Sequence, residues 1–561
     1  MLRIGNASGY WGDDPSAIER QLNGGRLDYL TLDFLAETTM SILQKQRAAN
    51  PELGYAMDFV SMLSKNLGKA LKQKVRIISN AGGMNPEGCA QAILKVAGQQ
   101  GLSPKIAVVT GDNVLPILSK DSFPPNVSNL LSANAYLGAT PIVEALMLGA
   151  DLVITGRVAD GSLALAPMVH EFHWRWNDWN KLSSGMVAGH ILECGAQVTG
   201  GNFTDWQKVP SFSEMGFPIV EVENSGDFVV TKHPETGGLV TVETVKEQLV
   251  YEIGDPSAYL SPDVVVDFCS VHLEQTGENR VHVSGVTGGE PTDRYKVSVC
   301  YDNGFKCVGS LPVSGPNARE KAQSFASQFW QACPKDFEDT LTEIFGSDDL
   351  LLRLGARTPD KKKIATFSKL IPAFLLSGPP GITLLMDALP KVHEVISFFP
   401  GFIPKTALTP QVVFLSEGTR EQKQVPGALS GKFRVEDVRK KVQTAEKPQP
   451  VTSTGNIELS ELCFARSGDK GDSVNIGVLA RSPHFYGVLR DKLTAQFVKN
   501  CFQQACAGVV TRYEMDNLQG LNFVLEKSLG GGGMTSLRMD ALGKMFAQTL
   551  LREKIEYHGA R

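Results

Sequence analysis

Short apolar runs alternate with amphipathic helical segments through the first 170 residues of the chain. Five runs have the pattern of buried strands that end in small or polar residues: LRIGNASGY, LDYLTLDFLAE, VRIISNAGG, KIAVVTGDN and ADLVITGRVADG. Helical periodicity lies between them, as in residues 15–23 and 57–71. Strands joined by crossover helices run parallel, so the pattern predicts an α/β fold with a large, mostly parallel sheet. Ligands of such sheets bind outside the carboxyl ends of the strands.

The residue composition and the hydrophobic pattern change along the rest of the chain. Residues 199–315 are rich in β-branched and aromatic residues with frequent turn signals, which predicts a β-rich, mostly antiparallel lobe within a large domain, residues 1–440. A helical pattern returns at residues 317–345, and residues 441–455 have the composition of an exposed linker. The tail, residues 456–561, has strands, a helix, two strands, a four-glycine loop and a final helix at 536–554. We therefore expect a small C-terminal α+β domain of the ferredoxin-like type.

Composition limits the class of protein. The 561-residue chain has 42% hydrophobic and 20% charged residues, near the globular average, and a net charge of −5. No overall basic field favours nucleic acid, and no window approaches the roughly 18 uninterrupted apolar residues of a membrane span. The first strand-like residues begin at Leu2, so we expect no signal peptide. We expect a cytoplasmic protein with no nucleic-acid or membrane partner. The nine scattered cysteines contain no C-x-x-C pair, which is typical of reduced, packed thiols.

Carboxylates stand at several predicted strand ends. Asp33 and Glu37 follow the second strand, and Asp112 follows the fourth. Two carboxylates in a polar site can acquire different pKa values, as proton transfer near neutral pH requires, so all three are candidate catalytic residues. The alternative is that Asp33 caps a strand end and Glu37 stabilises the first turn of a helix.

Two glycine-rich loops offer backbone and amide groups to a ligand. The first strand ends in GNASGYWGDDPSA, and the third ends in SNAGGMNPEG. Exposed N–H groups and a helix N-terminus at such loops can hold an anion or an oxyanion. The first loop lacks the G-x-G pair of dinucleotide-binding proteins, which argues against that class. The candidate binding residues in these loops are Gly5, Asn6, Ser8, Asn80, Gly82, Gly83 and Asn85.

The fifth strand end supplies a fixed cation. Arg157 is followed by Asp160 and Ser162 in a loop that opens a helix. A guanidinium can bind a carboxylate or phosphate in a bidentate manner, so all three are candidate substrate-binding residues. The alternative is a buried ion pair of Arg157 with Asp160 or Asp112.

A further segment combines His190, Glu193 and Cys194 within one helical turn. A cysteine beside a histidine could be a nucleophile with its base, whereas the alternative is a packed helix that ends at glycines. His170 and His173, with Glu171 between them, could begin a metal site, but no third ligand stands at matching spacing. No metal site is therefore predicted.

The stretch ARSGDKGDSVNIG in the tail places charged and hydroxyl groups between two apolar runs. Its two glycines permit a tight loop from Arg466 to Ser473. We interpret the loop as part of the same site, with Asp469 and Lys470 as candidate catalytic residues. Arg466, Ser467 and Asp472 are candidate binding residues. The alternative is a hairpin tip whose charges face water.

Taken together, these motifs resemble the AtuA family of acyclic terpene utilisation proteins. The residues that carry the resemblance are GNASGYWGDDPSA, DYLTLDFLAE, NAGGMNP, GADLVITGRVADGSLALAP and AGHILECGAQVTGGNF, with ARSGDKGDSVNIG similar to the signature of the family's ferredoxin-like domain. The resemblance spans nearly the whole chain. It implies a role in the catabolism of branched acyclic isoprenoids, a route that runs through acyl-CoA thioesters, and it assigns no catalytic residue.

The resulting hypothesis is an acid/base enzyme, a lyase, hydratase or hydrolase, that acts on a branched acyl-CoA or related carboxylate without a redox cofactor. The alternative is a non-catalytic ligand-binding or assembly subunit of an acyl-CoA-processing complex. A nucleotide-dependent ligase is disfavoured because no G-x-x-x-x-G-K-[ST] sequence is present. The sequence leaves the cofactor unknown, and a homo-oligomer is compatible with it.

Overall fold

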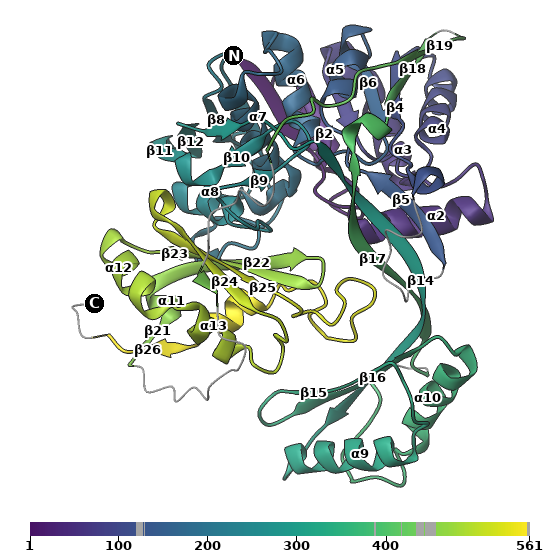
Figure 1. Cartoon of the computed structure of the whole chain (residues 1–561), viewed down its shortest axis with the longest axis vertical. Coiled ribbons are helices and arrows are strands. Elements are labelled where there is room, and N and C mark those ends of the chain that lie inside the picture. The colour runs from purple at the N-terminus through teal and green to yellow at the C-terminus, as the bar shows by residue number, and fades with distance from the viewer. Residues whose placement is uncertain are drawn as a thin grey trace.

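The computed structural model describes residues 1–118, 127, 129–385, 389–416, 418–433, 442–443 and 456–557. Its largest sheet has eleven strands in the order β11-β12-β8-β7-β1-β2-β3-β6-β4-β18-β19. The middle strands, β1, β2, β3, β6 and β4, pair in parallel, and the strands on either side continue the sheet with antiparallel pairing. The predicted α/β class is confirmed (Figure 1). The five central strands are β1 (Leu2–Asn6), β2 (Tyr29–Leu32), β3 (Arg76–Ser79), β6 (Leu152–Thr155) and β4 (Ile106–Thr110).

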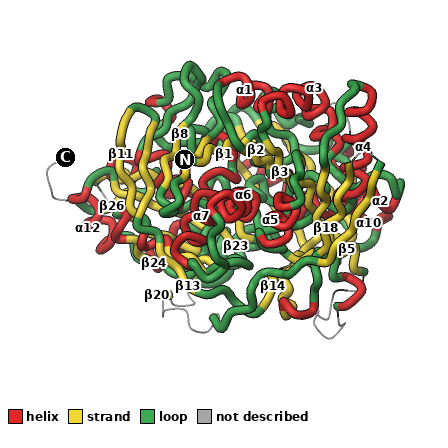
Figure 2. The backbone as a smooth tube through the Cα atoms, turned by 90° about the horizontal axis from the view of Figure 1, so that it is seen from above, coloured by secondary structure: helices red, strands yellow, loops and turns green. Residues whose placement is uncertain are grey.

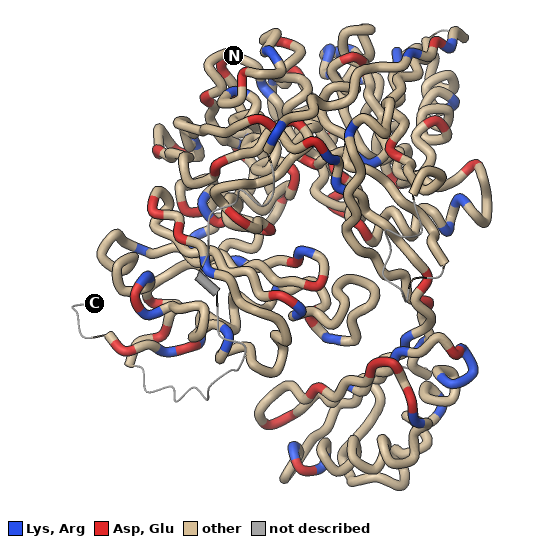
Figure 3. The backbone as a smooth tube through the Cα atoms, in the orientation of Figure 1, with Lys and Arg blue, Asp and Glu red and all other residues tan. Residues whose placement is uncertain are grey.

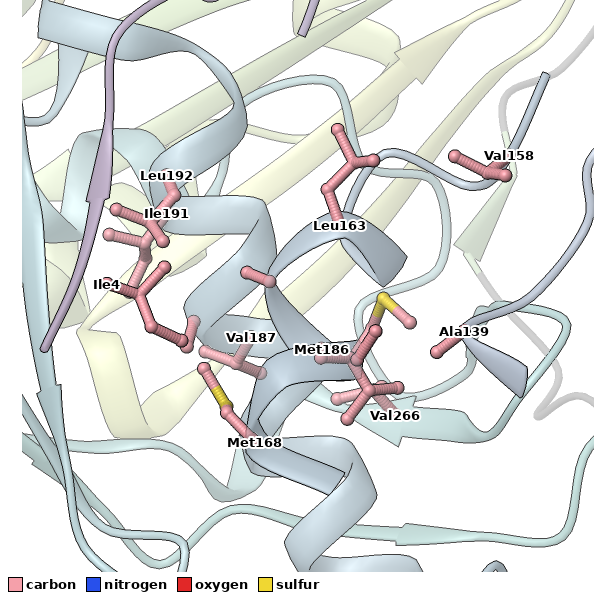
Figure 4. Close-up of a cluster of buried hydrophobic side chains, with 14 of the residues drawn as sticks. Ile4, Ala139, Val158, Leu163, Met168, Met186, Val187, Ile191, Leu192 and Val266 are labelled. Carbon is pink, nitrogen blue, oxygen red and sulfur yellow. The ribbon is translucent and has the colours of Figure 1, made fainter. Parts of the chain in front are cut away.

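Helices cover both faces of this sheet, because side chains of successive strand residues point to opposite faces. Ile77 packs into the core on one face, whereas Ile78 packs into the core on the other. The first core includes α1 (Ala17–Gly24), α3 (Met57–Gln73) and α4 (Pro86–Gln99). The second includes α5 (Thr140–Met147), α6 (Ser162–Phe172) and α7 (Trp179–Glu193). Figure 4 shows this second core, with Met186 and Val187 of α7 packed near Met168 of α6.

The stretch predicted to be β-rich contributes to three sheets. Four of its strands extend the large sheet beyond β1, and a small three-stranded sheet lies beside α7. The bounds are β7 (Ile219–Val222), β8 (Phe228–Thr231), β11 (His272–Gly277), β12 (Arg280–Ser284), β9 (Tyr259–Leu260), β10 (Val265–Asp267) and β13 (Thr287–Gly289), with α8 (Val242–Leu249) between β8 and β9. Strands β18 (Gln411–Ser416) and β19 (Thr419–Gln424) form the opposite edge of the large sheet.

The long strand β14 (Arg294–Val313) connects the large body to a distal lobe. It pairs with β5 (Leu130–Ala135) near its start and with β16 (Leu350–Thr358) near its end, while β17 (Val392–Pro404) follows it on the other side. The distal lobe adds β15 (Asp339–Phe345), α9 (Ala318–Ala332) and α10 (Lys361–Ala373), and it projects from the body in Figure 1. Helix α2 (Glu37–Ala49) packs against β5 and β17.

One helical prediction is only half right. The predicted helical segment 317–345 contains α9, but its last seven residues form strand β15. The proline after Cys333 cannot continue a helix, and DTLTEIF is rich in the β-branched and aromatic residues that favour a strand.

The C-terminal domain, residues 456–557, has its own core and a sheet in the order β20-β24-β25-β23-β22. The predicted ferredoxin-like α+β domain is confirmed. Of the predicted linker 441–455, only Val442 and Gln443 (β20) lie among the described residues. The bounds are β21 (Ile457–Glu458), α11 (Leu459–Leu462), β22 (Cys463–Lys470), β23 (Ser473–Ala480), α12 (Pro483–Lys492), α13 (Ala495–Cys501), β24 (Val510–Met515), β25 (Gly520–Leu525), α14 (Phe546–Leu550) and β26 (Lys554–Ile555).

The predicted final helix, residues 536–554, is reduced to the five residues of α14. Before it, the Asp540 carboxylate accepts hydrogen bonds from the backbone N–H groups of Lys544 and Met545, and Gly543 has a φ of 65°. Side-chain bonds to local N–H groups compete with helix formation, so this segment forms a loop instead. Figure 2 shows the helices, strands and loops of the chain from above. None of the helices among the described residues has the length and hydrophobicity of a membrane span.

Candidate functional site

The loop after β6 fixes Arg157 by contacts on several sides. Its Nη1 donates to the Leu35 carbonyl at 3.0 Å and to the Asp160 carboxylate at 2.6 Å. The guanidinium lies over the Tyr136 ring, 4.1 Å from the ring centroid, and the side chain is only 2% exposed. Arg157 therefore forms the buried ion pair with Asp160 that the sequence left open as an alternative to substrate binding. Arg157 acts here as a fixed positive charge inside the site.

Glu37 lies beside this guanidinium at the start of α2. Its Oε1 accepts a hydrogen bond from the Tyr136 hydroxyl at 2.7 Å and pairs with Lys296 Nζ at 3.3 Å. Burial acts to raise the pKa of Glu37, but Lys296, Arg157 and the Tyr136 hydrogen bond together lower it strongly. Glu37 is therefore an ionised carboxylate held by a lysine and a tyrosine.

Asp33, at the end of β2, has the opposite protonation. Its Oδ1 accepts from Asn80 Nδ2 at 2.7 Å and from the Leu35 N–H at 3.1 Å. Burial, followed by the negative charge of Asp160, raises the pKa of Asp33 well above its usual range. A neutral acid and an ionised carboxylate thus lie near the same guanidinium, which is the separation of pKa values that acid/base chemistry uses.

The end of α7 adds a histidine and a glutamate. His190 Nδ1 lies 2.9 Å from Glu193 Oε1, and His190 Nε2 lies 3.1 Å from the Gln248 carbonyl. A carbonyl oxygen only accepts, so Nε2 carries a proton, and one further proton is shared between Nδ1 and Glu193. Burial raises the pKa of Glu193, which favours its protonated form.

Cys194 does not have the surroundings of a nucleophile. Burial, with the charges of Glu193 and Glu252, raises the pKa of its thiol well above the usual range. Both ring nitrogens of His190 are engaged with other groups. The Cys194–His190 pair considered from the sequence is therefore replaced by the packed-helix alternative.

The C-terminal domain brings three charged side chains to this region. Lys470 Nζ donates to the Glu252 carbonyl at 3.0 Å, and Lys544 Nζ pairs with Glu252 Oε1 at 2.8 Å and with Asp469 Oδ1 at 3.5 Å. Lys544 also donates to the Tyr251 hydroxyl. These contacts join the C-terminal domain to the loop after α8 in the large domain.

The charges of the two domains act on one another. Burial and Glu252 raise the pKa of Asp469 to about 6, with Glu37 adding to the rise and Lys544 opposing it. Burial and Lys296 lower the pKa of Lys470, which also interacts with Glu37 and Glu193. We call this set the charged cluster, and its members are Asp33, Glu37, Tyr136, Arg157, Asp160, Glu193, Glu252, Lys296, Asp469, Lys470 and Lys544.

The cluster is enclosed by protein without being sealed from solvent. The side chains of Glu37, Asp160 and Lys296 keep exposures of 26%, 32% and 42%. Figure 3 shows acidic and basic positions interspersed along the chain rather than divided into regions of one sign. Charged side chains of both signs are therefore partly accessible to solvent here.

The hairpin that carries Asp469 and Lys470 is not the loop that the sequence suggested. Strands β22 and β23 pair as far as Lys470 with Ser473, so only Gly471 and Asp472 form the turn. Gly468 lies inside the strand, where a Cβ atom would overlap the side chains of Tyr251 and Glu252. This glycine serves the close approach of the strand to the cluster and does not form a turn.

Arg466, Ser467 and Asp472 were predicted to bind substrate, and the structure gives each a partner in the protein. Arg466 is 4% exposed and pairs with buried Glu247 at 2.9 Å, and Ser467 accepts a hydrogen bond from the Ala547 N–H at 2.9 Å. Asp472 accepts from the Gly531 N–H at 2.7 Å. Arg466 and Ser467 lie in strand β22, and the side chains of both are buried.

The first glycine-rich loop closes on itself. Asn6 and Ser8 exchange hydrogen bonds, and the Ser8 hydroxyl donates to the Asp33 carbonyl at 3.0 Å. Gly5 lies within β1, where a Cβ atom would press on Leu27 and Gln21. Through Ser8, this loop supports the backbone of Asp33.

Of the other predicted binding residues, one contacts a cluster carboxylate and the rest cap helices, pack closely or bond elsewhere. Asn80 orients Asp33, whereas Asn85 is the N-cap of α4 and accepts from the Gly88 N–H at 3.0 Å. Gly82 and Gly83 allow close packing on Thr155, Pro86 and Leu43. Ser162 donates to the buried Asp263 carboxylate at 3.0 Å.

Asp112 also has a supporting position. Its Oδ2 accepts from Asn134 Nδ2 at 2.7 Å and from the Arg157 backbone N–H at 3.0 Å. Burial raises the pKa of Asp112. It links β5 to the loop after β6 and so holds Arg157 in place.

Several cluster residues were not identified from the sequence. Tyr136 and Lys296 are adjacent because β5 pairs with β14, and the Tyr136 N–H donates to the Lys296 carbonyl at 2.9 Å. Glu252 and Lys544 lie in loops with no distinctive motif. A tyrosine directly after an apolar run, as in LLSANAY, was the one local signal available.

Among the described residues, no group of three or more His, Cys, Asp or Glu side chains is placed to hold a metal ion. The donor set of the cluster is instead carboxylates interleaved with lysine and arginine. Such a mixture of charges is suited to moving protons and to holding an anionic substrate.

The fold and the site define a two-domain α/β protein whose ferredoxin-like C-terminal domain completes a charged cluster on the large domain. A model of the acyclic terpene utilisation family protein AtuA matches residues 2–414, and a model of the AtuA ferredoxin-like domain matches residues 457–556. The chain belongs to the AtuA family of acyclic terpene utilisation proteins. A comparison with curated proteins found no match.

Proposed function

We propose that this protein is an acid/base enzyme that acts on a branched acyl-CoA in acyclic terpene utilisation, as a hydratase, lyase or hydrolase. The observation that carries the proposal is the entry of Asp469 and Lys470, from the C-terminal domain, into a cluster built by strand ends of the large domain. Family membership supports the link to acyclic terpenes.

Asp469 is the residue proposed to move the proton. Its pKa of about 6 lets it exchange a proton near neutral pH, and it is 26% exposed, so a substrate can contact it. Glu37 is too strongly held as a carboxylate for this role, and Asp33 is only 5% exposed.

Lys470 and Lys296 are proposed to stabilise negative charge on the substrate. Lys296 lowers the pKa of Lys470, so the two cations lie close enough to repel each other. Among the described residues, the hydrogen bond of Lys470 Nζ is to the Glu252 carbonyl, which leaves further N–H groups for an anion. A developing thioester oxyanion between these lysines would relieve their repulsion.

The test is incubation of the purified chain with a panel of branched saturated and unsaturated acyl-CoA thioesters, followed by mass spectrometry. Addition or loss of water identifies a hydratase or lyase, and release of CoA identifies a hydrolase. Asp469→Asn should lower turnover by roughly 10²–10⁴-fold, the contribution typical of a positioned acid/base group. Lys470→Met should lower it by roughly 10²–10³-fold, the contribution typical of one oxyanion-stabilising donor. Lys470→Met should keep a melting temperature near that of the wild type, and Asp469→Asn should not melt below it, because removing a carboxylate with a raised pKa does not destabilise the fold.

Asp491→Asn is the matched control, because Asp491 is an exposed carboxylate of α12 in the same domain. It should retain full turnover. No change in any thioester on incubation with the wild type would contradict the proposal and would favour the non-catalytic ligand-binding subunit instead.

A further inference from the structure

A second polar feature lies where the distal lobe meets the C-terminal domain. A cavity of about 350 Å³ is lined by strands β14, β16 and β17 and by the loop that follows the four-glycine stretch. Small-molecule sites occupy roughly 300–1,000 Å³, so this cavity has the size of one. We call it the cationic cavity, after the lining residues Lys306, Arg353, Lys391 and Arg538.

Its lining charges have one sign. None of the described residues that line the cavity is acidic, and His393 adds a fifth nitrogen-bearing side chain. Arg353 pairs with Glu343 just outside the lining, but Lys306 and Arg538 are bonded to carbonyl oxygens, of Ser536 at 2.8 Å and of Ala505 at 3.1 Å. Carbonyl oxygens carry no net charge, so the described residues leave most of the positive charge of the cavity without a carboxylate partner.

The convergence of these cations is electrostatically unfavourable. Burial and the positive charge of Arg353 lower the pKa of Lys306 to about 8. An anion in the cavity would remove this repulsion. Four cations from four separate segments match an anion with more than one negative charge better than a single carboxylate.

The cationic cavity is connected to the charged cluster by a short stretch of the C-terminal domain. The Ser397 hydroxyl, four residues beyond His393 on β17, lies 2.6 Å from the Thr535 hydroxyl. Four strand residues span about 13 Å. Gly531, in the same loop as Thr535, donates to Asp472 at the turn that carries Asp469 and Lys470.

The segment from Gly530 to Lys544 therefore touches both features. Its middle, Ser536 to Ala541, lines the cationic cavity, and its end, Lys544, enters the charged cluster. A ligand that filled both places would have to be elongated, with a multiply charged end and a reactive end.

We infer that the cationic cavity binds a phosphate ester or diphosphate group of the substrate. This inference rests on the proposed function in one respect, that the phosphates belong to the carrier end of an acyl thioester. The cavity itself is assigned on its own charges and volume.

The experiment measures binding to the intact protein by isothermal titration calorimetry. The ligands are CoA, adenosine 3′,5′-bisphosphate, inorganic phosphate and pantetheine, which lacks phosphate. CoA and the bisphosphate should bind, and pantetheine should bind at least tenfold more weakly than CoA. Lys306→Met and Lys391→Met should each weaken binding of the bisphosphate by at least tenfold.

Lys369→Met is the charge-matched control, because Lys369 lies exposed on α10 of the same lobe and outside the cavity lining. It should leave binding unchanged. Lys391 is exposed, so its substitution tests the site even if removal of Lys306 disturbs folding.

Failure to bind any of the phosphate ligands, or equal binding by the two cavity variants and the wild type, would overturn the inference. Inorganic phosphate that binds as tightly as CoA would support the phosphate site while assigning it to free phosphate. Because binding is measured without turnover, an inactive protein that still binds the bisphosphate would contradict the proposed function and leave the cavity assignment intact.

Discussion

At the scale of single residues, the site is organised by protonation. Glu37 is held ionised, and burial raises the pKa of Asp33 and Glu193 and so favours their neutral forms. Burial and the negative charge of Glu252 raise the pKa of Asp469 to about 6. The neighbours of each carboxylate, rather than its residue type, decide which of them can exchange a proton at neutral pH.

The raised pKa of Asp469 has a consequence for stability. The folded protein binds this proton more tightly than the unfolded chain, whose aspartates titrate near about pH 3.9. The resulting stability is fully present below that value and is lost as the pH rises through about 6. Asp469→Asn cannot ionise, so it should be more stable than the wild type at about pH 8 by roughly 1–3 kcal/mol.

Urea unfolding at about pH 4.5 and about pH 8 checks this prediction, because the difference between variant and wild type should shrink at the lower pH. A difference of the same size at both values would show that Asp469 is not destabilised by ionisation. In the same pH range, kcat/KM of the wild type should fall below about pH 6 if Asp469 acts as the base.

At the scale of elements, the hairpin β22–β23 depends on the glycine loop beneath it. A Cβ atom on Gly532 would overlap the Gly471 carbonyl oxygen at the turn, whereas the nearest atom to a Cβ on Gly530 is 3.6 Å away. The two glycines have similar left-handed φ angles, 66° and 63°. They therefore differ in packing and hardly at all in backbone strain.

Gly530→Ala and Gly532→Ala form a matched pair on this basis. Both should lose roughly 1–2 kcal/mol because an alanine is strained in the left-handed region. Gly532→Ala should lose a further 1–3 kcal/mol or so by overpacking, and should lower turnover because the turn that carries Lys470 must move. Thermal unfolding and the acyl-CoA assay measure the two effects, and equal losses in both variants would show that the turn tolerates the displacement.

The elements also show how far the sequence can predict this molecule. Alternation of apolar strands and amphipathic helices predicts the five parallel strands, and the strand-end rule correctly places Asp33, Glu37, Arg157 and Asp160 near one another. Tyr136 and Lys296 could not be predicted, because they become neighbours through the pairing of β5 with β14, more than 150 residues apart. The burial of Arg466 beside Glu247 could not be predicted, because glycines that serve close packing in a strand look like glycines of a loop.

At the scale of the whole molecule, the two domains meet through specific polar contacts. Arg481 forms a bidentate pair with Asp205 at 2.7 and 2.6 Å, and buried Asn522 donates to the Gly254 carbonyl at 2.6 Å. Asn475 accepts from the Glu252 N–H at 2.7 Å. The last contact lies directly beside a cluster residue, so the interface and the charged cluster are parts of one structure.

Loss of these contacts should uncouple the domains. The wild type should unfold in a single calorimetric transition, whereas Arg481→Ala combined with Asn522→Ala should give two, because each buried group left unpaired costs about 1–3 kcal/mol. Arg552→Ala, which removes an exposed cation of the same domain, is the control and should retain one transition. A single transition in the double variant would show that apolar contacts suffice to couple the domains.

Strand β14 passes without a break from Lys296 in the charged cluster to the distal lobe. Hydrogen bonds to β16 and β17 stiffen β14 against bending within the sheet, so the strand holds the large domain and the distal lobe at a fixed distance. The pairing of β14 with β17 shifts register between Asp302 and Phe305. Such an irregularity bends a strand locally, so a rotation of the distal lobe would be centred there. Any swing of the lobe about this point would open or close the space between Lys306 and the glycine loop while leaving Lys296 in place.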